Sequence, residues 1–370
     1  MAKTARAMAL VGALALALAG CGSQPSSTGT SSPATGAGTT AATTTSAPAS
    51  NFHACMVSDS GGIDDRAFNA TAWKGMQDAQ KSLGVKVDFL ESKSNADYVP
   101  NIQKWVQADC GIIVTVGFLL GDATKEAAAA NPSKKFAIVD FAYPEPIANV
   151  KPLIFDTAQA AFQAGYLAAA MTKSGTVATY GGIKIPTVTI FMDGFWEGVQ
   201  YYNSQKGKNV KVIGWDEKTQ NGSFTGDFED QNKGRQFTNN FIQQGADIIL
   251  PVAGPVGLGT AAAAKATNGR VNVIWVDTDG CVSAQQYCSL FLTSVVKGID
   301  VAVTDVVKAA SDGSFSGDPF VGTLDNKGVS IAPFHEFDSK VPAEVKSELE
   351  TIKADIVSGK IKITSPSSPK

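Results

Sequence analysis

Side chains suited to holding a small molecule gather in residues 58–76, SDSGGIDDRAFNATAWKGM. An apolar stretch precedes this segment, two adjacent glycines interrupt it, and apolar residues then recur at helical spacing. That pattern predicts a strand, a loop and a helix. In a parallel α/β sheet, ligands bind at such a corner, beyond the carboxyl end of the strand. We therefore expect four side chains at the mouth of a binding site: Asp59, Asp65, Phe68 and Asn69.

The same loop admits two other interpretations. It contains neither GxGxxG nor a Gly-Lys-Ser/Thr run, so phosphate binding has little support. Asp64 or Asp65 would serve as the N-cap of an ordinary helix. The two carboxylates would also suit a hydrolase. Because the sequence has no nucleophile elbow, no metal cluster and no suitably placed histidine, we expect no enzymatic activity.

The composition is that of a globular protein with no charge bias. The chain has 370 residues, 44% hydrophobic and 18% charged, which is enough for two domains with apolar cores. A formal net charge of -3 gives no electrostatic basis for binding nucleic acid. His53 and His335 lie far apart, without partners at the spacing of zinc ligands. We expect neither a metal centre nor a cofactor.

The N-terminus has the pattern of a cleaved targeting signal, which we assign to residues 1–20. A basic start precedes the apolar run of residues 8–20, which is too short to span a bilayer as a mature helix. The run ends in LAGC, residues 18–21, which resembles a bacterial lipobox. That resemblance implies cleavage before Cys21 and lipidation of this cysteine. The alternative is a plain signal peptide followed by a chance cysteine.

A tether follows the signal. Residues 22–51 consist of Ser, Thr, Gly, Ala and Pro almost throughout and carry no charge, and such a composition buries too little apolar surface to fold. We interpret residues 21–51 as the lipidated cysteine and a flexible linker. No later segment reaches about 18 consecutive apolar residues, so the lipid alone is expected to hold the protein at the membrane. These features predict a position on the extracytoplasmic face of a bacterial cell membrane.

Four cysteines remain beyond Cys21, and an even number outside the cytoplasm indicates disulfides, with three possible connectivities. Cys55 and Cys110 each precede or open a predicted strand, and neighbouring parallel strands that start together would bring them within bridging range. Cys281 and Cys288 would then close a small surface loop. The alternative is four free, partly buried thiols.

From residue 52 onward, predicted strands and helices alternate, as in parallel βαβ units whose apolar strands are covered on both faces. A short extended crossing at 154–156 and a buried helix at 158–172 lead into a second series of the same kind, which ends at residue 277. The first series comprises strands at 54–58, 86–90, 111–117 and 135–140 and helices at 66–83, 96–108 and 121–130.

The pattern after residue 292 predicts that the chain crosses back between two lobes. We expect a helix at 294–311, extended segments within 320–337 and a last helix at 343–358. The predicted fold is therefore α/β, with two doubly wound parallel-sheet lobes joined by a hinge of several chain crossings. The expected boundaries are 52–155 plus 293–320 for lobe 1, 156–292 plus 321–362 for lobe 2, and 363–370 for a polar tail.

A series of short motifs runs in order through residues 54 to 340, among them QAAFQAGYLA at 159–168. Together they resemble the basic membrane lipoproteins (PnrA-like), the nucleoside-binding proteins of ABC importers. The resemblance implies the type I periplasmic-binding-protein fold. The other matching segments are residues 58–73, 117–119, 136–140, 181–186, 191–198, 228–234, 254–257, 276–279 and 293–297.

The resemblance also implies a ligand site. Phe68 and Phe228 would stack on the two faces of a purine, because a flat heteroaromatic ring suits aromatic enclosure. Asp140, at the end of its strand, would accept hydrogen bonds from the base. Asp59 and Asn69 would add polar contacts. The alternatives are a core position for Phe228 and a helix cap for Asp140.

Ribose hydroxyls are expected to meet Asp277 or Asp279, with Lys297 and the backbone of Gly254. A carboxylate suits a diol because it offers several acceptor sites to two donors. The alternative for Lys297 is a solvated position on a helix, the commoner environment of lysine.

These expectations describe a lipid-tethered protein that captures nucleosides, purines favoured, and delivers them to an ABC permease. Closing of the lobes would be an equilibrium that the ligand biases, with no covalent chemistry. We expect a monomer. The alternatives are the same fold binding a sugar or another small solute, or acting as a ligand sensor.

Overall fold

The computed structural model describes residues 51–369. The predicted signal peptide, Cys21 and all of the tether except residue 51 lie outside the described residues. Within residues 51–369, no helix combines the length and the apolar character needed to cross a bilayer.

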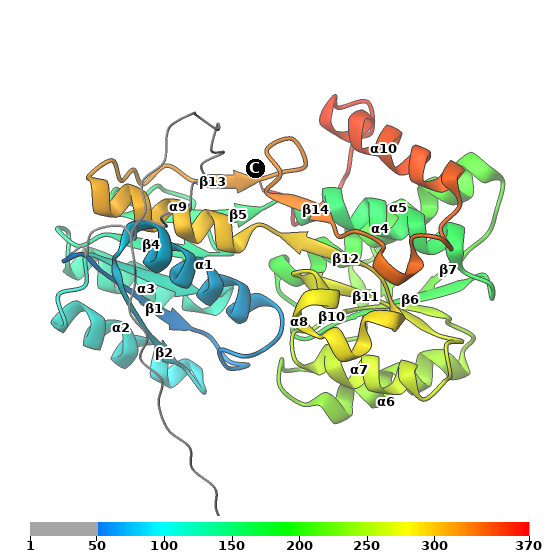
Figure 1. The fold of residues 1–370 in the computed structure, drawn as a ribbon, viewed down its shortest axis with the longest axis horizontal. Coiled ribbons are helices and arrows are strands. Elements are labelled where there is room, and N and C mark those ends of the chain that lie inside the picture. Colours follow the sequence, from blue (N-terminus) through cyan, green and yellow to red (C-terminus); the bar gives the residue numbers. More distant parts are fainter. Residues whose placement is uncertain (1–50, 370) are drawn as a thin grey trace, which may run out of the picture. The chain divides into compact units, whose positions relative to one another are not determined.

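Two six-stranded sheets form the centres of two lobes, which confirms the predicted α/β fold (Figure 1). The first sheet has the order β13-β5-β4-β3-β1-β2, and all its strand pairs are parallel. Its strands are β1 (His53–Ser58), β2 (Lys86–Glu91), β3 (Ile112–Val116), β4 (Phe136–Val139), β5 (Val150–Phe155) and β13 (Phe320–Gly322).

The second sheet has the order β14-β12-β11-β10-β6-β7 and is parallel except for the edge strand β14. Its strands are β6 (Thr176–Gly181), β7 (Lys211–Ile213), β10 (Ile248–Val252), β11 (Asn272–Asp277), β12 (Phe291–Lys297) and β14 (Val329–Ile331). The short strands β8 (Trp215–Asp216) and β9 (Asn221–Gly222) pair separately.

Both faces of each sheet are buried, because the strands are apolar on both sides. In β1, Ala54 and Met56 pack with the cluster under α1 (Phe68–Leu83) and α9 (Ile299–Asp312). Cys55 and Val57 face the opposite cluster under α2 (Tyr98–Gln107) and α3 (Gly121–Ala130). Successive residues of one strand thus pack alternately against the helices on one face of the sheet and those on the other. The remaining long helices are α4 (Thr157–Met171), α5 (Pro186–Lys206), α6 (Gln231–Gln243), α7 (Val256–Lys265) and α10 (Ala343–Val357).

Helix α4 is buried against α5, as its small residues predict. A Cβ on Gly165 would lie 2.1 Å from the carbonyl oxygen of Phe195 in α5. A Cβ on Gly194 would lie 2.3 Å from the carbonyl oxygen of Ala158 in α4. Glycine at these positions lets the two backbones approach closely. The helix that leaves the first crossing is therefore held rigidly in the second lobe.

The chain passes between the sheets three times: from β5 to α4, from β12 to α9, and from β13 to β14. The predicted helix at 294–311 is wrong at its start, because residues 291–297 form β12 in the second sheet. The expected assignment of residues 293–297 to lobe 1 is corrected with it. β-Branched residues at 293, 295 and 296 favour the strand, and the helix begins only after Gly298.

Two other expectations are corrected by the structure. The short crossing predicted at 154–156 is the end of β5, a full strand between β4 and β13. The polar tail is packed onto the second lobe. Ser365 donates to the fully buried Asp193 at 2.6 Å, and Ser368 donates to Asp156, where the chain first crosses between lobes, at 2.9 Å. The buried carboxylate of Asp193 needs such a donor, so these two hydrogen bonds hold the C-terminal segment in place.

Both predicted disulfides are present, Cys55–Cys110 and Cys281–Cys288. The first joins the start of β3 to its neighbour β1, as expected from strands that begin together. The second closes the loop around the short helix α8 (Gly280–Ser283).

We predict that the two disulfides stabilise the fold unequally. Loop-closure entropy grows with loop length, so Cys55–Cys110, with a sequence separation of 55, should contribute about 4 kcal/mol to the free energy of unfolding. Cys281–Cys288, with a separation of 7, should contribute about 2 kcal/mol. Urea unfolding of the two double Cys→Ala variants measures both. Equal losses, or a larger loss for the second pair, would contradict this account.

Candidate functional site

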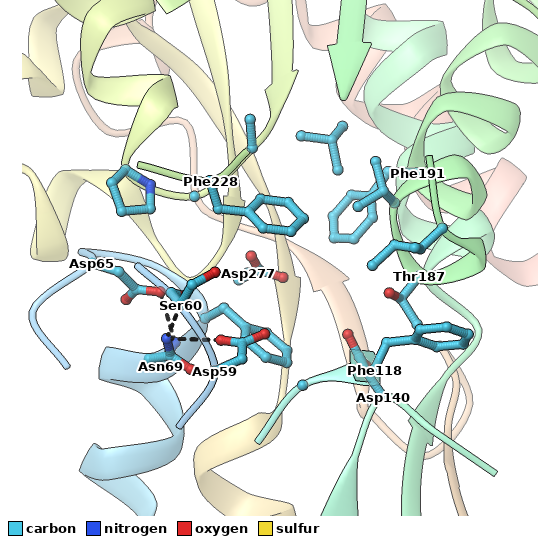
Figure 2. A pocket seen from close by; sticks show the side chains of 18 of the residues that line it. Asp59, Ser60, Asp65, Asn69, Phe118, Asp140, Thr187, Phe191, Phe228 and Asp277 are labelled. Atoms are coloured by element: carbon cyan, nitrogen blue, oxygen red, sulfur yellow. Dashed lines mark hydrogen bonds between the residues drawn. The ribbon is translucent and has the colours of Figure 1, made fainter. Parts of the chain in front are cut away.

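A pocket of about 550 Å³, including its open mouth, is lined by residues from both lobes (Figure 2). Its residues lie mainly where parallel strands end and the following loops begin, the usual ligand position in such folds. Nine of the ten predicted ligand-binding residues line it: Asp59, Asp65, Phe68, Asn69, Asp140, Phe228, Gly254, Asp277 and Lys297.

Asn69 organises the loop that follows β1. Its Nδ2 donates to Asp59 Oδ1 at 3.1 Å and to the carbonyl oxygens of Ser60 and Gly62 at 3.3 and 3.2 Å (Figure 2). Asp65 caps α1 by accepting from the backbone nitrogens of Ala67 and Asn69 at 2.9 and 2.8 Å. The N-cap position itself is Ala67, so the predicted N-cap at Asp64 or Asp65 is wrong by position, although the Asp65 carboxylate does accept from the first turn of the helix. Asp65 also lies at the pocket wall.

Burial changes the acidity of both carboxyl groups of this loop. It raises the pKa of Asp59 well above the ordinary value, and the Asn69 hydrogen bond opposes the shift only in part. Burial likewise raises the pKa of Asp65 to about 6, against the backbone donors that lower it. Asp64 by contrast is exposed and pairs with Arg66 at 2.8 Å. The arrangement gives Asp64 and Asp65 separate structural partners rather than a shared reacting centre.

The same backbone device occurs in both lobes. Asp140 follows β4 and Asp277 ends β11, and both have a left-handed backbone, with φ of 67° and 66°. Aspartate is among the few residues apart from glycine that tolerate this conformation. Each strand therefore ends in a sharp change of direction with its carboxylate at the pocket.

Lys297, at the end of β12, lies between these two aspartates. Its Nζ is 2.6 Å from Asp140 Oδ2 and 3.3 Å from Asp277 Oδ1, and its side chain is only 2% exposed. The alternative of a solvated helical lysine is wrong. Burial alone would lower the pKa of Lys297, but the two carboxylates outweigh it and raise that pKa, so the ammonium stays charged.

Aromatic rings surround the ammonium. Lys297 Nζ lies 4.8 Å from the ring centre of Phe68, 5.2 Å from that of Phe191 and 5.9 Å from that of Phe155. A desolvated cation is attracted to ring faces at such distances. The lysine thus contacts Phe68 as well as the two carboxylates.

The pocket has more acceptors than donors. Four carboxyl groups and one ammonium line it. Of the residues that line the pocket, Asn69 and Asp277 each have a buried Oδ1 without a well-formed hydrogen bond, although Asp277 Oδ1 lies 3.3 Å from the Lys297 ammonium. Buried acceptors of this kind are ordinarily satisfied. The site therefore suits an uncharged ligand with several hydrogen-bond donors.

Phe228 reaches the pocket from the second lobe (Figure 2), and Phe68 lines the same pocket from the first lobe. It lies in the loop before α6, beside the half-buried Asp227 and the exposed Glu229, as its charged flanks predict. A Cβ on Gly182 would lie 2.3 Å from its ring, so only glycine there lets the ring pack in this position. Two flat rings from different lobes thus meet one cavity.

Asp279 is the predicted site residue that the pocket does not include. It caps α8 by accepting from the nitrogen of Cys281 at 2.9 Å, and His335 Nε2 lies 2.7 Å from its other oxygen. Asp277 and Asp279 were both considered as partners of the ribose hydroxyls, and the structure brings Asp277 to the pocket. Two residues further along, the chain has already turned into the following helix.

Ten lining residues were not assigned a role from the sequence, although six of them lie in segments that carry the resemblance. Their positions just after a strand or at the start of a helix could have identified them as residues near the ligand site. They are Ser60, Gly117, Phe118, Ile185, Thr187, Val188, Phe191, Val252, Ala253 and Pro255.

Two groups of potential metal ligands occur among the described residues, His53 with Cys55 and Cys110, and Asp279 with Cys281 and His335. Their close approach was not expected from the sequence spacing. Each group contains at least one disulfide-bonded cysteine, and metals bind the thiolate form. Neither group supports a metal centre while the disulfides are intact.

Comparison with known proteins identifies the family. The family model described as "ABC transporter substrate-binding protein PnrA-like" matches residues 52–366, nearly the whole folded part. The chain belongs to this PnrA-like family. It is thus a substrate-binding protein of the kind that serves ABC transporters, a class of binding proteins rather than enzymes.

Two curated proteins match this chain along most of their length. The chain is 31% identical to the CD4+ T-cell-stimulating antigen of Listeria monocytogenes, over 85% of this chain and 88% of that protein. It is 30% identical to the ABC transporter nucleoside-binding protein BmpA of Lactococcus lactis, over 85% and 90%. A solute-binding protein of Aeropyrum pernix shares the fold, with a TM-score of 0.76, 24% identity and coverage of 85% and 94%.

We predict that Lys297→Met lowers the free energy of unfolding by about 3 to 5 kcal/mol near neutral pH, because two buried carboxylates lose their cation. Burial already raises the pKa of Asp140 and of Asp277, and the substitution should raise both further. A raised folded-state pKa stabilises below the ordinary value of 3.8 and loses that effect as pH rises. The difference in the free energy of unfolding between wild type and Lys297→Met should therefore be smaller at pH 4.5 than at pH 7.5.

The matched control is Lys308→Met, which removes an exposed lysine paired with Asp312 in α9. It should change stability little at either pH. Urea unfolding of both variants at the two pH values makes the comparison. A deficit for Lys297→Met that does not depend on pH would contradict the electrostatic assignment.

Proposed function

We propose that the pocket binds nucleosides, purine nucleosides foremost, and that the protein delivers them to an ABC permease. The observation that carries this proposal is that Phe68 and Phe228 line one cavity from opposite lobes beside a row of carboxyl groups. Aromatic enclosure suits a flat base, and carboxylates suit hydroxyl and amino donors. The Lactococcus lactis relative is named a nucleoside-binding protein.

In this proposal, Asp140 accepts hydrogen bonds from the base, and Asp277 and Lys297 hold the ribose hydroxyls together with the backbone of Gly254. Asp277 Oδ1 supports this role, since it contacts the Lys297 ammonium at 3.3 Å but has no well-formed hydrogen bond, which a ligand hydroxyl would supply. Burying polar groups that only the right donors satisfy favours a ligand of matching pattern. Four carboxyl groups against one lysine disfavour phosphorylated forms.

Contacts between the lobes support capture by closure. The indole nitrogen of Trp275 in β11 donates to the backbone oxygen of Arg66, in the loop that carries Asp59 and Asp65, at 3.2 Å. The loop around the first set of site residues therefore rests on the second lobe. Three chain crossings would act as the hinge, and a ligand that contacts both lobes would shift the equilibrium toward the closed state.

The place of action follows from the N-terminal residues, which lie outside the described part of the chain. We propose that Cys21 carries a lipid and that the linker holds the folded part at the outer face of the membrane. The family name supports an ABC permease as the partner.

We predict that a refolded, ligand-free domain of residues 52–370 gains thermal stability with adenosine, guanosine or inosine, because a ligand that binds only the native state raises the midpoint. Phe68→Ala and Phe228→Ala should each weaken nucleoside binding about 10- to 100-fold, since each removes one stacking face. Calorimetric titration measures both effects. Phe315→Ala, outside the pocket, is the matched control and should bind normally.

Stabilisation by sugars alone, with no effect of either phenylalanine substitution, would favour the sugar-binding alternative. Stabilisation by neither class would leave the nucleoside proposal without support.

We predict that Asp277→Asn weakens nucleoside binding at least about tenfold, while Asp279→Asn leaves it unchanged. Asparagine has nearly the size of aspartate and tolerates the left-handed backbone of residue 277. The two variants therefore differ in whether the altered group lines the pocket. Loss of binding in Asp279→Asn with normal binding in Asp277→Asn would reverse the assignment.

A further inference from the structure

A second cavity adjoins the pocket. It has about 660 Å³ of unfilled space, including its open side, and shares four lining residues with the pocket: Phe118, Asp140, Thr187 and Lys297. Figure 2 shows Phe118 and Thr187 close together on one side of the pocket, above Asp140. We name this second cavity the side compartment. Because those four residues face both spaces, a ligand in the pocket lies directly beside it.

The walls of the side compartment are mainly apolar. Phe141 and Phe155 contribute from the first lobe, and Pro186 and Ile190 from α5. Phe141 packs on Phe118 with ring centres 5.1 Å apart. Residues 367 and 369 of the docked C-terminal segment complete the lining. The sequence predicted only a polar tail at 363–370, so neither this wall nor the compartment was expected.

The side compartment has no unbalanced charge for an ionic group. Its charged residues are Asp140 and Lys297, which pair at 2.6 Å, and Lys297 also contacts Asp277. A phosphate placed there would meet the carboxylate of Asp140 and a lysine whose charge Asp140 and Asp277 already compensate. An uncharged apolar group would instead replace water against aromatic and aliphatic side chains, which is favourable.

We propose that the side compartment receives an apolar substituent on the ligand, at the end that faces Asp140. The inference rests on the proposed function, in which Asp140 accepts from the base. The substrate class is then a purine nucleoside that carries a hydrocarbon group on its exocyclic nitrogen. A secondary amine retains one N–H for Asp140, so the added group does not cost the hydrogen bond.

The shape of the side compartment fits such a group. Its inner end is formed by buried residues, Phe155 and Lys297, whereas Ala142 and Pro186 at its rim are exposed. A substituent would pass from the buried base toward the surface between the two lobes. It would be covered on one side by the C-terminal segment.

The test compares adenosine with N6-benzyladenosine by calorimetric titration of the refolded domain. The wild-type protein should bind the benzyl compound at least as tightly as adenosine. Ala142→Trp, which fills the rim without touching the pocket, should weaken binding of the benzyl compound about tenfold and leave adenosine within about twofold. Ser367→Phe, from the C-terminal wall, should act in the same direction.

Ala129→Trp makes the same change at an exposed position of α3 outside both cavities, and should affect neither ligand. Wild-type protein that binds adenosine but rejects the benzyl compound more than about tenfold would overturn the inference. Equal binding of both ligands by wild type and Ala142→Trp would overturn it too. If adenosine itself fails to bind, the nucleoside proposal fails, and this inference fails with it.

Discussion

The buried ammonium of Lys297 between two aspartates is the interaction on which the site depends. Asp140 comes from the first lobe, whereas Asp277 and Lys297 come from adjacent strands of the second. A lysine that is 2% exposed is tolerated only because carboxylates compensate its charge. The pairing also crosses between the lobes, so the electrostatic balance of the pocket requires the two halves to meet.

Much of the surrounding geometry serves this arrangement. Parallel strands bring their carboxyl ends to one edge of each sheet, and left-handed aspartates turn the chain at two of those ends. Close packing of α4 on α5 through glycines holds the second lobe beside the first crossing. The aromatic rings around Lys297 then exclude water from the ion pairs, which strengthens them. The hydrogen-bond donors of a ligand would therefore meet a site whose side chains are mostly oriented before the ligand binds.

Local patterns predicted the parts of the site that local structure controls. The loop after β1 was identified because glycines, an aspartate cap and helical periodicity lie within twenty or so consecutive residues. Asp140 and Asp277 were expected at the site through the family resemblance, with Asp140 also placed at the end of its strand. Lys297 was associated with the ligand through family resemblance, but its strand was taken for a helix. The apolar run of residues 291–297 fits either element, and pairing with β11 decides it.

The sequence by itself determined the α/β class, the alternating order of most elements, the pairing expected of the cysteines and the chemical character of the pocket. The first three depend on periodicity, residue type and short spacing, whereas most of the pocket residues were expected through the family resemblance. Only the tertiary structure decided that Asp277 rather than Asp279 lines the pocket, that the C-terminal segment packs beside a second cavity, and that Lys297 is shared between two aspartates. Each of these depends on contacts between residues far apart in the chain, whose side chains meet only when both lobes have folded and packed together.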